Sequence, residues 1–116
     1  MAKCDEGYRC EVCGRDVERI DDSDLYLRFV IGELDAEVLH TSPERHIRCN
    51  PVLAQFIQDE SFEAVTVSGA FDRRQLDAAF VRDRDALVTR GYQRLLELAR
   101  EGVERDLTKY PLPEFR

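Results

Sequence analysis

The sequence predicts an α+β fold, in which a small antiparallel sheet packs on a long C-terminal helix or helix pair. Apolar residues alternate along residues 25–31, a period of two that is typical of a strand. Along residues 76–98 they recur at steps of three, four and seven, which indicates one face of a helix. A chain of 116 residues suits one domain with a modest core.

The first elements predict a hairpin. Residues 17–20 are expected to form a short strand, and the polar residues 21–24 (Asp-Asp-Ser-Asp) to form a turn. Residues 25–31 form the second and clearer strand, which Gly32 ends. We expect residues 1–7 to be a frayed tail.

Two helix starts follow the predicted hairpin. Residues 41–44 (Thr-Ser-Pro-Glu) fit a capping box. In this motif Thr41 caps the helix, and the side chain of Glu44, three residues later, hydrogen-bonds back to the backbone N–H of Thr41. Asn50 and Pro51 are a favoured cap and a favoured first helical residue. The second helix is expected to continue to about residue 59.

The C-terminal half predicts a strand, a long helix and a tail. Residues 62–67 are rich in β-branched residues and predict the strand. Asp72 can cap the helix, which is expected to run to Gly102 with a break near Asp77. Residues 110–116 contain two prolines and predict an extended tail.

The long helix carries one apolar stripe. The stripe consists of Leu76, Phe80, Leu87, Gly91, Leu95 and Leu98. Core packing explains most of it, but Gly91 costs about 1 kcal/mol relative to Ala in a helix. It therefore indicates a close approach by another backbone, from this chain or from a partner. Val88, Leu96 and Ala99 widen the stripe and favour a homodimer through the C-terminal helix.

Two pairs of metal-binding side chains carry the strongest functional signal. Cys10 and Cys13 are separated by two residues, and so are His46 and Cys49. This gap lets a turn bring two side chains to one ion, and three thiolates with one imidazole are a common structural zinc set. The sequence therefore predicts a structural Zn²⁺ held by these four residues.

Cys49 directly precedes the predicted helix at Pro51, whose free N–H groups are expected to lower the pKa of its thiol. Cys4 and His40 are spare ligand candidates. A dithiol redox pair, or ordinary buried cysteines with a surface His46, are the alternatives to a metal site. Zinc and iron are not distinguished by the spacing.

These motifs resemble the treble-clef and zinc-ribbon families over roughly residues 8–60. The matching parts are a Cys-x-x-Cys-Gly knuckle at residues 10–14, a hairpin at residues 17–31 and a second ligand pair before a helix. The resemblance implies a structural zinc and nothing specific about a substrate. We expect a single domain over residues 1–116, made of a zinc module at 8–60, a strand plus long helix at 61–102 and an extended tail at 103–116.

The charge distribution narrows the choice of partner. The net charge is −7, and residues 1–60 carry 7 Lys and Arg against 14 Asp and Glu, whereas residues 61–116 carry 10 of each. An acidic zinc module is poorly suited to a phosphate backbone. The sequence shows neither a secretory hydrophobic region nor a membrane-spanning run, and its thiols fit a cytoplasmic location.

The sequence therefore predicts a small cytoplasmic zinc-binding protein that acts as a protein–protein interaction or regulatory module. The alternative is a zinc-ribbon-type regulator associated with nucleic acid. Its basic face would consist of Arg73, Arg74, Arg82, Arg90 and Arg94. A zinc-dependent hydrolase with Glu37 or Glu44 as base is less favoured. We assign no catalytic residue, because the chain carries no phosphate loop, dinucleotide fingerprint or catalytic triad motif.

Overall fold

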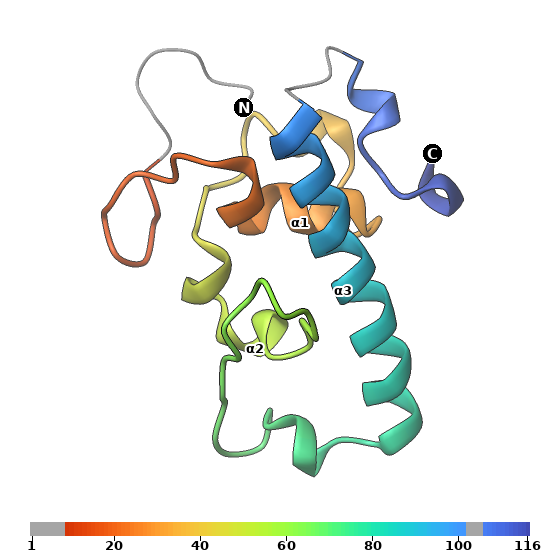
Figure 1. Ribbon diagram of the computed structural model, residues 1–116. Coiled ribbons are helices and arrows are strands. Elements are labelled where there is room, and N and C mark those ends of the chain that lie inside the picture. Colours follow the sequence, from red (N-terminus) through yellow and green to blue (C-terminus); the bar gives the residue numbers. More distant parts are fainter. Residues whose placement is uncertain (1–8, 102–105) are drawn as a thin grey trace.

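The computed structural model describes residues 9–101 and 106–116, and these residues are mainly helical (Figure 1). The α-helices are α1 at Asp24–Val30, α2 at Pro51–Ala54 and α3 at Ala78–Glu101, joined by short 3-10 turns. The described ranges contain no strand and no sheet, only two isolated β-bridges. The predicted α+β fold is therefore wrong, and the hairpin expected from the zinc-module resemblance is absent from residues 17–31.

Helix α1 occupies the segment that was predicted as the clearest strand. The hydroxyl of Ser23 caps it by accepting the backbone N–H of Tyr26 at 3.1 Å. All residues from 25 to 31 are buried except Arg28, which is partly exposed. Both sets of alternating residues are therefore buried, so the alternation does not distinguish a core face from a solvent-exposed face. A short apolar run buried on all sides carries no reliable period.

Three other predicted elements also differ. The predicted strand at residues 17–20 is a loop that enters a 3-10 turn at Ile20–Asp22. The predicted helix start at residues 41–44 lies in an irregular segment with no helix. The predicted strand at residues 62–67 is also irregular, and Phe62 is its only buried residue. With no neighbouring strand to pair with, β-branched residues alone do not form a strand.

Helix α2 starts at Pro51 as predicted but ends at Ala54. The side chain of Asn50 does not cap it and donates to Asp24 instead. Beyond the helix, Gln55 is buried and its amide donates to the carbonyls of Val52 and Phe71. These bonds hold the chain after Gln55 in a non-helical path, so the helix does not reach residue 59.

Helix α3 is the longest element, and it begins after the break predicted near Asp77. A 3-10 turn at Arg73–Gln75 precedes it, and a carboxylate oxygen of Asp77 accepts the N–H of Phe80 at 3.1 Å. The predicted stop at Gly102 lies outside the described residues. No helix in the described ranges is both long enough and apolar enough to cross a membrane.

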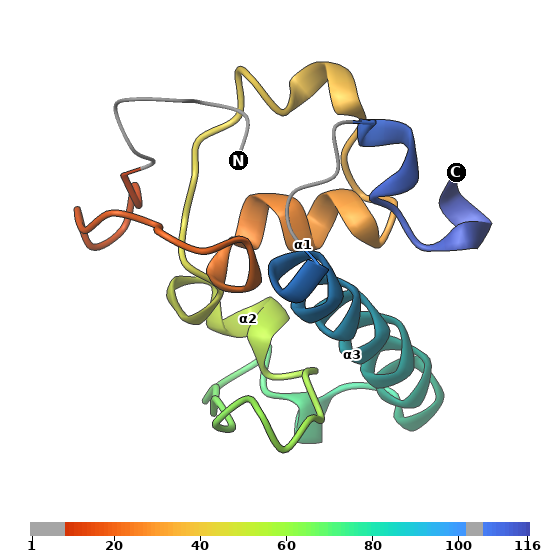
Figure 2. The ribbon, with the colours of Figure 1, turned by 45° about the horizontal axis from the view of Figure 1, so that its top comes forward.

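The buried face of α3 packs on α1, which lies across its C-terminal half (Figure 2). Gly91 makes this packing possible, because a Cβ there would lie 2.4 Å from Ile31 Cγ2 and 3.1 Å from Leu27 Cδ1. The close approach at Gly91 therefore comes from side chains of α1 and of Ile31 in the same chain, and not from another backbone as predicted. Leu96 and Ala99 also pack against this core.

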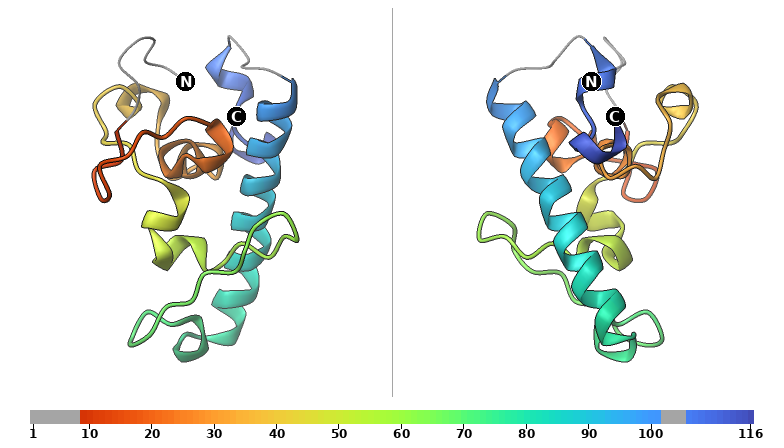
Figure 3. Two further views of the ribbon diagram at one scale, coloured as in Figure 1. Left: turned by 60° about the vertical axis from the view of Figure 1, so that its left-hand side comes forward. Right: turned by 90° about the vertical axis from the view of Figure 1, so that its right-hand side faces the viewer.

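The C-terminal residues 106–116 lie beside α1 (Figure 3). They contain 3-10 turns at Leu107–Lys109 and Pro113–Phe115 in place of one continuous extended run. The ring of Tyr110 lies 5.8 Å from that of Tyr26, and the N–H of Leu112 donates to Val30. The tail thus closes the core on the side of α1 away from the predicted metal ligands.

Candidate metal centre

The four predicted ligands come together in space. The ligand atoms of Cys10, Cys13, His46 and Cys49 all lie within 4.8 Å of one another. They come from two segments more than thirty residues apart: the loop that contains the first pair and the segment that leads into α2. The spare candidate His40 is exposed and outside the cluster, whereas Cys4 lies outside the described residues.

A tight turn presents the first pair. The N–H of Gly14 donates to the carbonyl of Cys10 at 2.9 Å, and the N–H of Cys10 donates to Arg15 at 2.9 Å. Gly14 has a φ of 79°, a left-handed conformation that residues with a Cβ rarely adopt. The glycine after Cys13 thus closes the loop that turns both sulfur atoms inward.

A 3-10 turn at Ile47–Cys49 presents the second pair. The N–H of Cys49 donates to the carbonyl of His46 at 3.0 Å, so one turn separates the two side chains. The loop of the first pair is attached to this segment, since the N–H of Glu11 donates to Glu44 at 2.9 Å. Both pairs are therefore held by backbone hydrogen bonds as well as by their own turns.

The imidazole of His46 is oriented for a metal. Its Nε2 lies 3.0 Å from the carbonyl oxygen of Asp16. A carbonyl oxygen can only accept a hydrogen bond, so Nε2 carries a proton, and in the neutral imidazole Nδ1 then keeps its lone pair. Nδ1 in turn lies 3.3 Å from the sulfur of Cys13 and 3.8 Å from that of Cys49. This is the arrangement of a metal-binding histidine whose other nitrogen is fixed by a second-layer carbonyl.

Two of the donor spacings are close to those of a tetrahedral metal site. With bonds of about 2.0–2.3 Å, neighbouring donors of such a site lie about 3.5–3.8 Å apart. The distances from His46 Nδ1 to the two sulfur atoms bracket that range. The cluster of four can therefore hold a metal ion, and its donor set suits zinc.

The surroundings of Cys10 and Cys49 shift the pKa values of their thiols in opposite directions. Burial opposes ionisation of Cys10, but backbone N–H groups of Cys13, His46 and Val12 outweigh it and lower its pKa to about 6. Burial and the neighbouring thiols raise the pKa of Cys49 to about 12. The expected lowering at Cys49 is therefore wrong, because burial and the thiols of Cys10 and Cys13 outweigh any effect of the N-terminus of α2.

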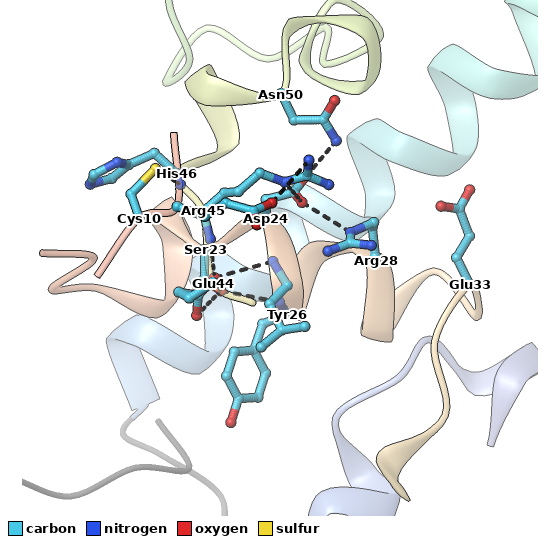
Figure 4. Close-up of polar contacts among 12 residues, drawn as sticks. Cys10, Ser23, Asp24, Tyr26, Arg28, Glu33, Glu44, Arg45, His46 and Asn50 are labelled. Atoms are coloured by element: carbon cyan, nitrogen blue, oxygen red, sulfur yellow. Dashed lines mark hydrogen bonds and ion pairs between the residues drawn. The ribbon is translucent and has the colours of Figure 1, made fainter. Parts of the chain in front are cut away.

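One buried carboxylate fixes the residues on both sides of the second pair (Figure 4). Asp24 is fully buried and accepts the Nε–H of Arg45 at 3.0 Å and the side-chain amide of Asn50 at 2.9 Å. Arg28 donates to it at 2.9 Å, and the N–H of Asp24 donates to the carbonyl of Arg45 at 2.8 Å. Arg45 precedes His46 and Asn50 follows Cys49, so Asp24 fixes both ends of the ligand segment.

Glu44 belongs to the same network. Both of its carboxylate oxygens lie 2.9 Å from the hydroxyl of Ser23, which donates to them, and one accepts the N–H of Arg45 at 3.0 Å (Figure 4). Burial raises the pKa of Glu44, although these hydrogen bonds oppose the rise. Glu44 thus serves the structure of this segment. Glu37, the other candidate base, is exposed in the 3-10 turn Ala36–Val38.

Sequence reasoning missed Asp24 and its partners. The run Asp-Asp-Ser-Asp at residues 21–24 resembles a polar turn, and nothing local sets Asp24 apart from its neighbours. Its role depends on Arg45 and Asn50, which lie more than twenty residues away. Such a contact becomes visible only when the fold brings the segments together.

Known proteins give no further guide to this centre. No protein-family model matches the chain, and no curated protein or solved structure matches it. The interpretation of the centre therefore depends on its own geometry.

Proposed function

We propose that this chain is a small protein with one structural zinc ion, held by Cys10, Cys13, His46 and Cys49, and that it serves as a protein-interaction module. The observation that supports the metal site best is the orientation of His46. Its Nε2 is fixed by the carbonyl of Asp16, and its Nδ1 faces two cysteine sulfurs. Neither a redox pair nor a set of ordinary buried cysteines requires that orientation.

The donor set favours a structural role for the ion. Four protein ligands fill a tetrahedral site and leave no position for water or substrate. Three thiolates also give the bound ion a net charge of about −1, which weakens it as a Lewis acid. Both carboxylate oxygens of Glu44 are engaged by Ser23, which leaves the hydrolase alternative without support.

The loop of residues 9–17 needs such an ion, because it has almost no apolar core of its own. Its buried cluster consists of Cys10 and Val17, with Cys49 packed against them. The main core begins at Ile20 and includes residues of all three α-helices. Zinc would therefore replace missing hydrophobic contacts, as metals do in other small modules.

The nucleic-acid alternative is weakened by the contacts of its arginines. Arg74 pairs with Asp72 at 2.6 Å, Arg90 pairs with Glu114 at 2.6 Å, and Arg73 pairs with Asp85. An arginine already paired with a carboxylate releases few counterions on meeting a phosphate. A protein partner remains the better proposal.

Native mass spectrometry of untagged protein, with and without a chelator, tests the zinc proposal. We expect one zinc per chain in the wild type. We also expect loss of the ion in Cys13→Ser, because three remaining ligands bind far more weakly. Cys4→Ser is the matched control and should keep the ion. A wild type that folds fully without metal, or a Cys13→Ser variant that keeps its zinc, would contradict the proposal. The same spectra measure whether the predicted homodimer forms.

A further inference from the structure

Three of the four proposed ligands are thiols, and the structure gives them unequal access to solvent. Cys13 is exposed, Cys49 is partly exposed, and Cys10 is buried with 2% of its surface accessible. All three sulfur atoms belong to the cluster whose ligand atoms lie within 4.8 Å of one another. A reagent from solvent therefore reaches Cys13 first and finds two further sulfur atoms beside it.

A bound metal would make the exposed sulfur reactive. Cysteine binds zinc as a thiolate, so the ion keeps the side chain of Cys13 deprotonated. The thiolate, and not the thiol, is the nucleophile that attacks peroxides. Hydroperoxides oxidise most readily a cysteine that is a thiolate, is exposed and has a second cysteine next to it. Cys13 fulfils these three conditions once the site holds zinc.

The contacts of the other two cysteines indicate which sulfur reacts second. The Cys10 sulfur accepts the backbone N–H of His46 at 3.5 Å and further N–H groups from its own turn. The Cys49 sulfur is partly open to solvent and lies within hydrogen-bonding reach of both other sulfur atoms. Attack by Cys10 would break its hydrogen bonds to the backbone, so Cys49 is the favoured second sulfur.

We propose that a hydroperoxide converts the zinc-loaded site into a Cys13–Cys49 disulfide and thereby expels the ion. This regulation rests on the zinc site proposed above, and it adds to that site a position of modification and a class of reactant. Cys10 and His46, the two ligands that remain, bind zinc too weakly to keep it.

Hydrogen peroxide is the only oxidant that the reaction needs. The Cys13 thiolate attacks one peroxide oxygen, the O–O bond breaks, and a sulfenic acid forms while the departing hydroxide takes up a proton to become water. The Cys49 thiolate then attacks the Cys13 sulfur, the S–O bond breaks, and a second hydroxide leaves as water with another proton. Two thiolates lose two electrons and the peroxide gains them. The ion leaves as Zn²⁺, with its oxidation state unchanged.

The position of the disulfide determines what happens to the loop of residues 9–17. A Cys13–Cys49 bond joins this loop to the ligand segment across more than thirty residues of chain, and so takes the place of the metal bridge. A Cys10–Cys13 bond would lie within the loop and connect it to nothing else. The proposed oxidation therefore releases zinc while the loop stays attached. A chelator, in contrast, removes the ion and leaves no bridge.

The test treats the zinc-loaded full chain with about one to five equivalents of hydrogen peroxide and follows released zinc with a chromophoric indicator. Free thiols are then alkylated in denaturant, and the protein is digested with trypsin. Cleavage after arginine gives one peptide of residues 10–15, with Cys10 and Cys13, and another that begins at Cys49. A linked pair of these peptides, with the alkyl group on Cys10, identifies the Cys13–Cys49 bond.

We expect one zinc ion to be released for each disulfide formed, and dithiothreitol with added zinc to reverse both changes. Dimedone, which reacts with sulfenic acids, should label Cys13. Cys4→Ser is the matched control and should release zinc at a rate within about twofold of the wild type. Cys10→Ser, which cannot form a Cys10–Cys13 bond, should still form the link to Cys49.

Hydrogen–deuterium exchange gives the structural readout. The amides of Glu11 and Gly14 donate to Glu44 and Cys10, and these bonds join and close the loop. After peroxide treatment both amides should exchange within about twofold of their rates in the zinc-loaded protein, whereas a chelator should raise the rates sharply.

Four results would overturn the inference. They are zinc that stays bound under peroxide, a disulfide between Cys10 and Cys13, a sulfinic acid at Cys13 without any disulfide, and loop exchange as fast after oxidation as after chelation. An untreated chain that carries no zinc would overturn the zinc proposal and this inference together. Zinc that is bound at the start and retained under peroxide would overturn this inference alone.

Discussion

Gly91 shows how one missing side chain can determine the packing of two helices. It lies on the buried face of α3, where Leu27 of α1 and the adjoining Ile31 occupy the space that a Cβ would need. Glycine lowers helix propensity, so its presence in the middle of a long helix indicates that close packing outweighs that loss. Glycine is favoured at Gly14 for a different reason. Its φ is positive, and no atom lies near the position that a Cβ would take.

Gly91→Ala should therefore destabilise the fold by about 1–3 kcal/mol, despite the better helix propensity of alanine. Chemical denaturation with circular dichroism measures the change. The double variant with Ile31→Leu, which removes the Cγ2 methyl 2.4 Å from the added carbon, should recover part of the loss. A stabilised Gly91→Ala protein would show that α1 does not approach α3 this closely.

At the scale of elements, Asp24 links α1 to the segment that carries His46 and Cys49. It fixes Arg45 before the pair and Asn50 after it. A ligand pair held at both ends loses little conformational freedom when it binds a metal, and so binds more tightly. Asp24 would act on the proposed metal only through these neighbours, as a positioning residue.

Asp24→Asn should lower the free energy of unfolding by about 3 kcal/mol, because it leaves the guanidiniums of Arg28 and Arg45 facing a neutral group. Zinc affinity, measured by competition with a chromophoric chelator, should fall in the variant even where it remains folded. Asp35→Asn changes an exposed carboxylate and should alter neither quantity. Unchanged zinc affinity in a folded Asp24→Asn protein would restrict Asp24 to a structural role.

The grouping of the two candidate ligand pairs could be predicted from sequence, whereas the elements between them largely could not. A gap of two residues between Cys10 and Cys13 is a local property, and local geometry follows from it. Whether residues 25–31 form a helix or a strand depends on whether the segment is buried on one face or on all faces, which no local pattern reveals. The break before α3 was predictable because Asp77 caps through its own backbone neighbours.

At the scale of the whole molecule, the main core and the loop of residues 9–17 depend on different forces. Among the described residues, the main core contains twenty buried apolar residues between Ile20 and Leu112. The loop contributes Cys10 and Val17 to a small separate cluster and is otherwise mostly exposed. Hydrophobic burial therefore suffices for the helices, while the loop depends on its hydrogen bonds and on the proposed metal.

Removal of the metal should accordingly release the loop and leave the helices folded. On chelation, we expect hydrogen–deuterium exchange to rise sharply at the amides of Cys10, Glu11 and Gly14, whose hydrogen bonds close the loop and join it to the ligand segment. The amides of α3 that face α1 should keep their protection, because the core they belong to contains no ligand side chain. Cooperative loss of protection throughout α3 would show that the two parts fold as one unit. Unchanged exchange in the loop would show that a metal does not hold it.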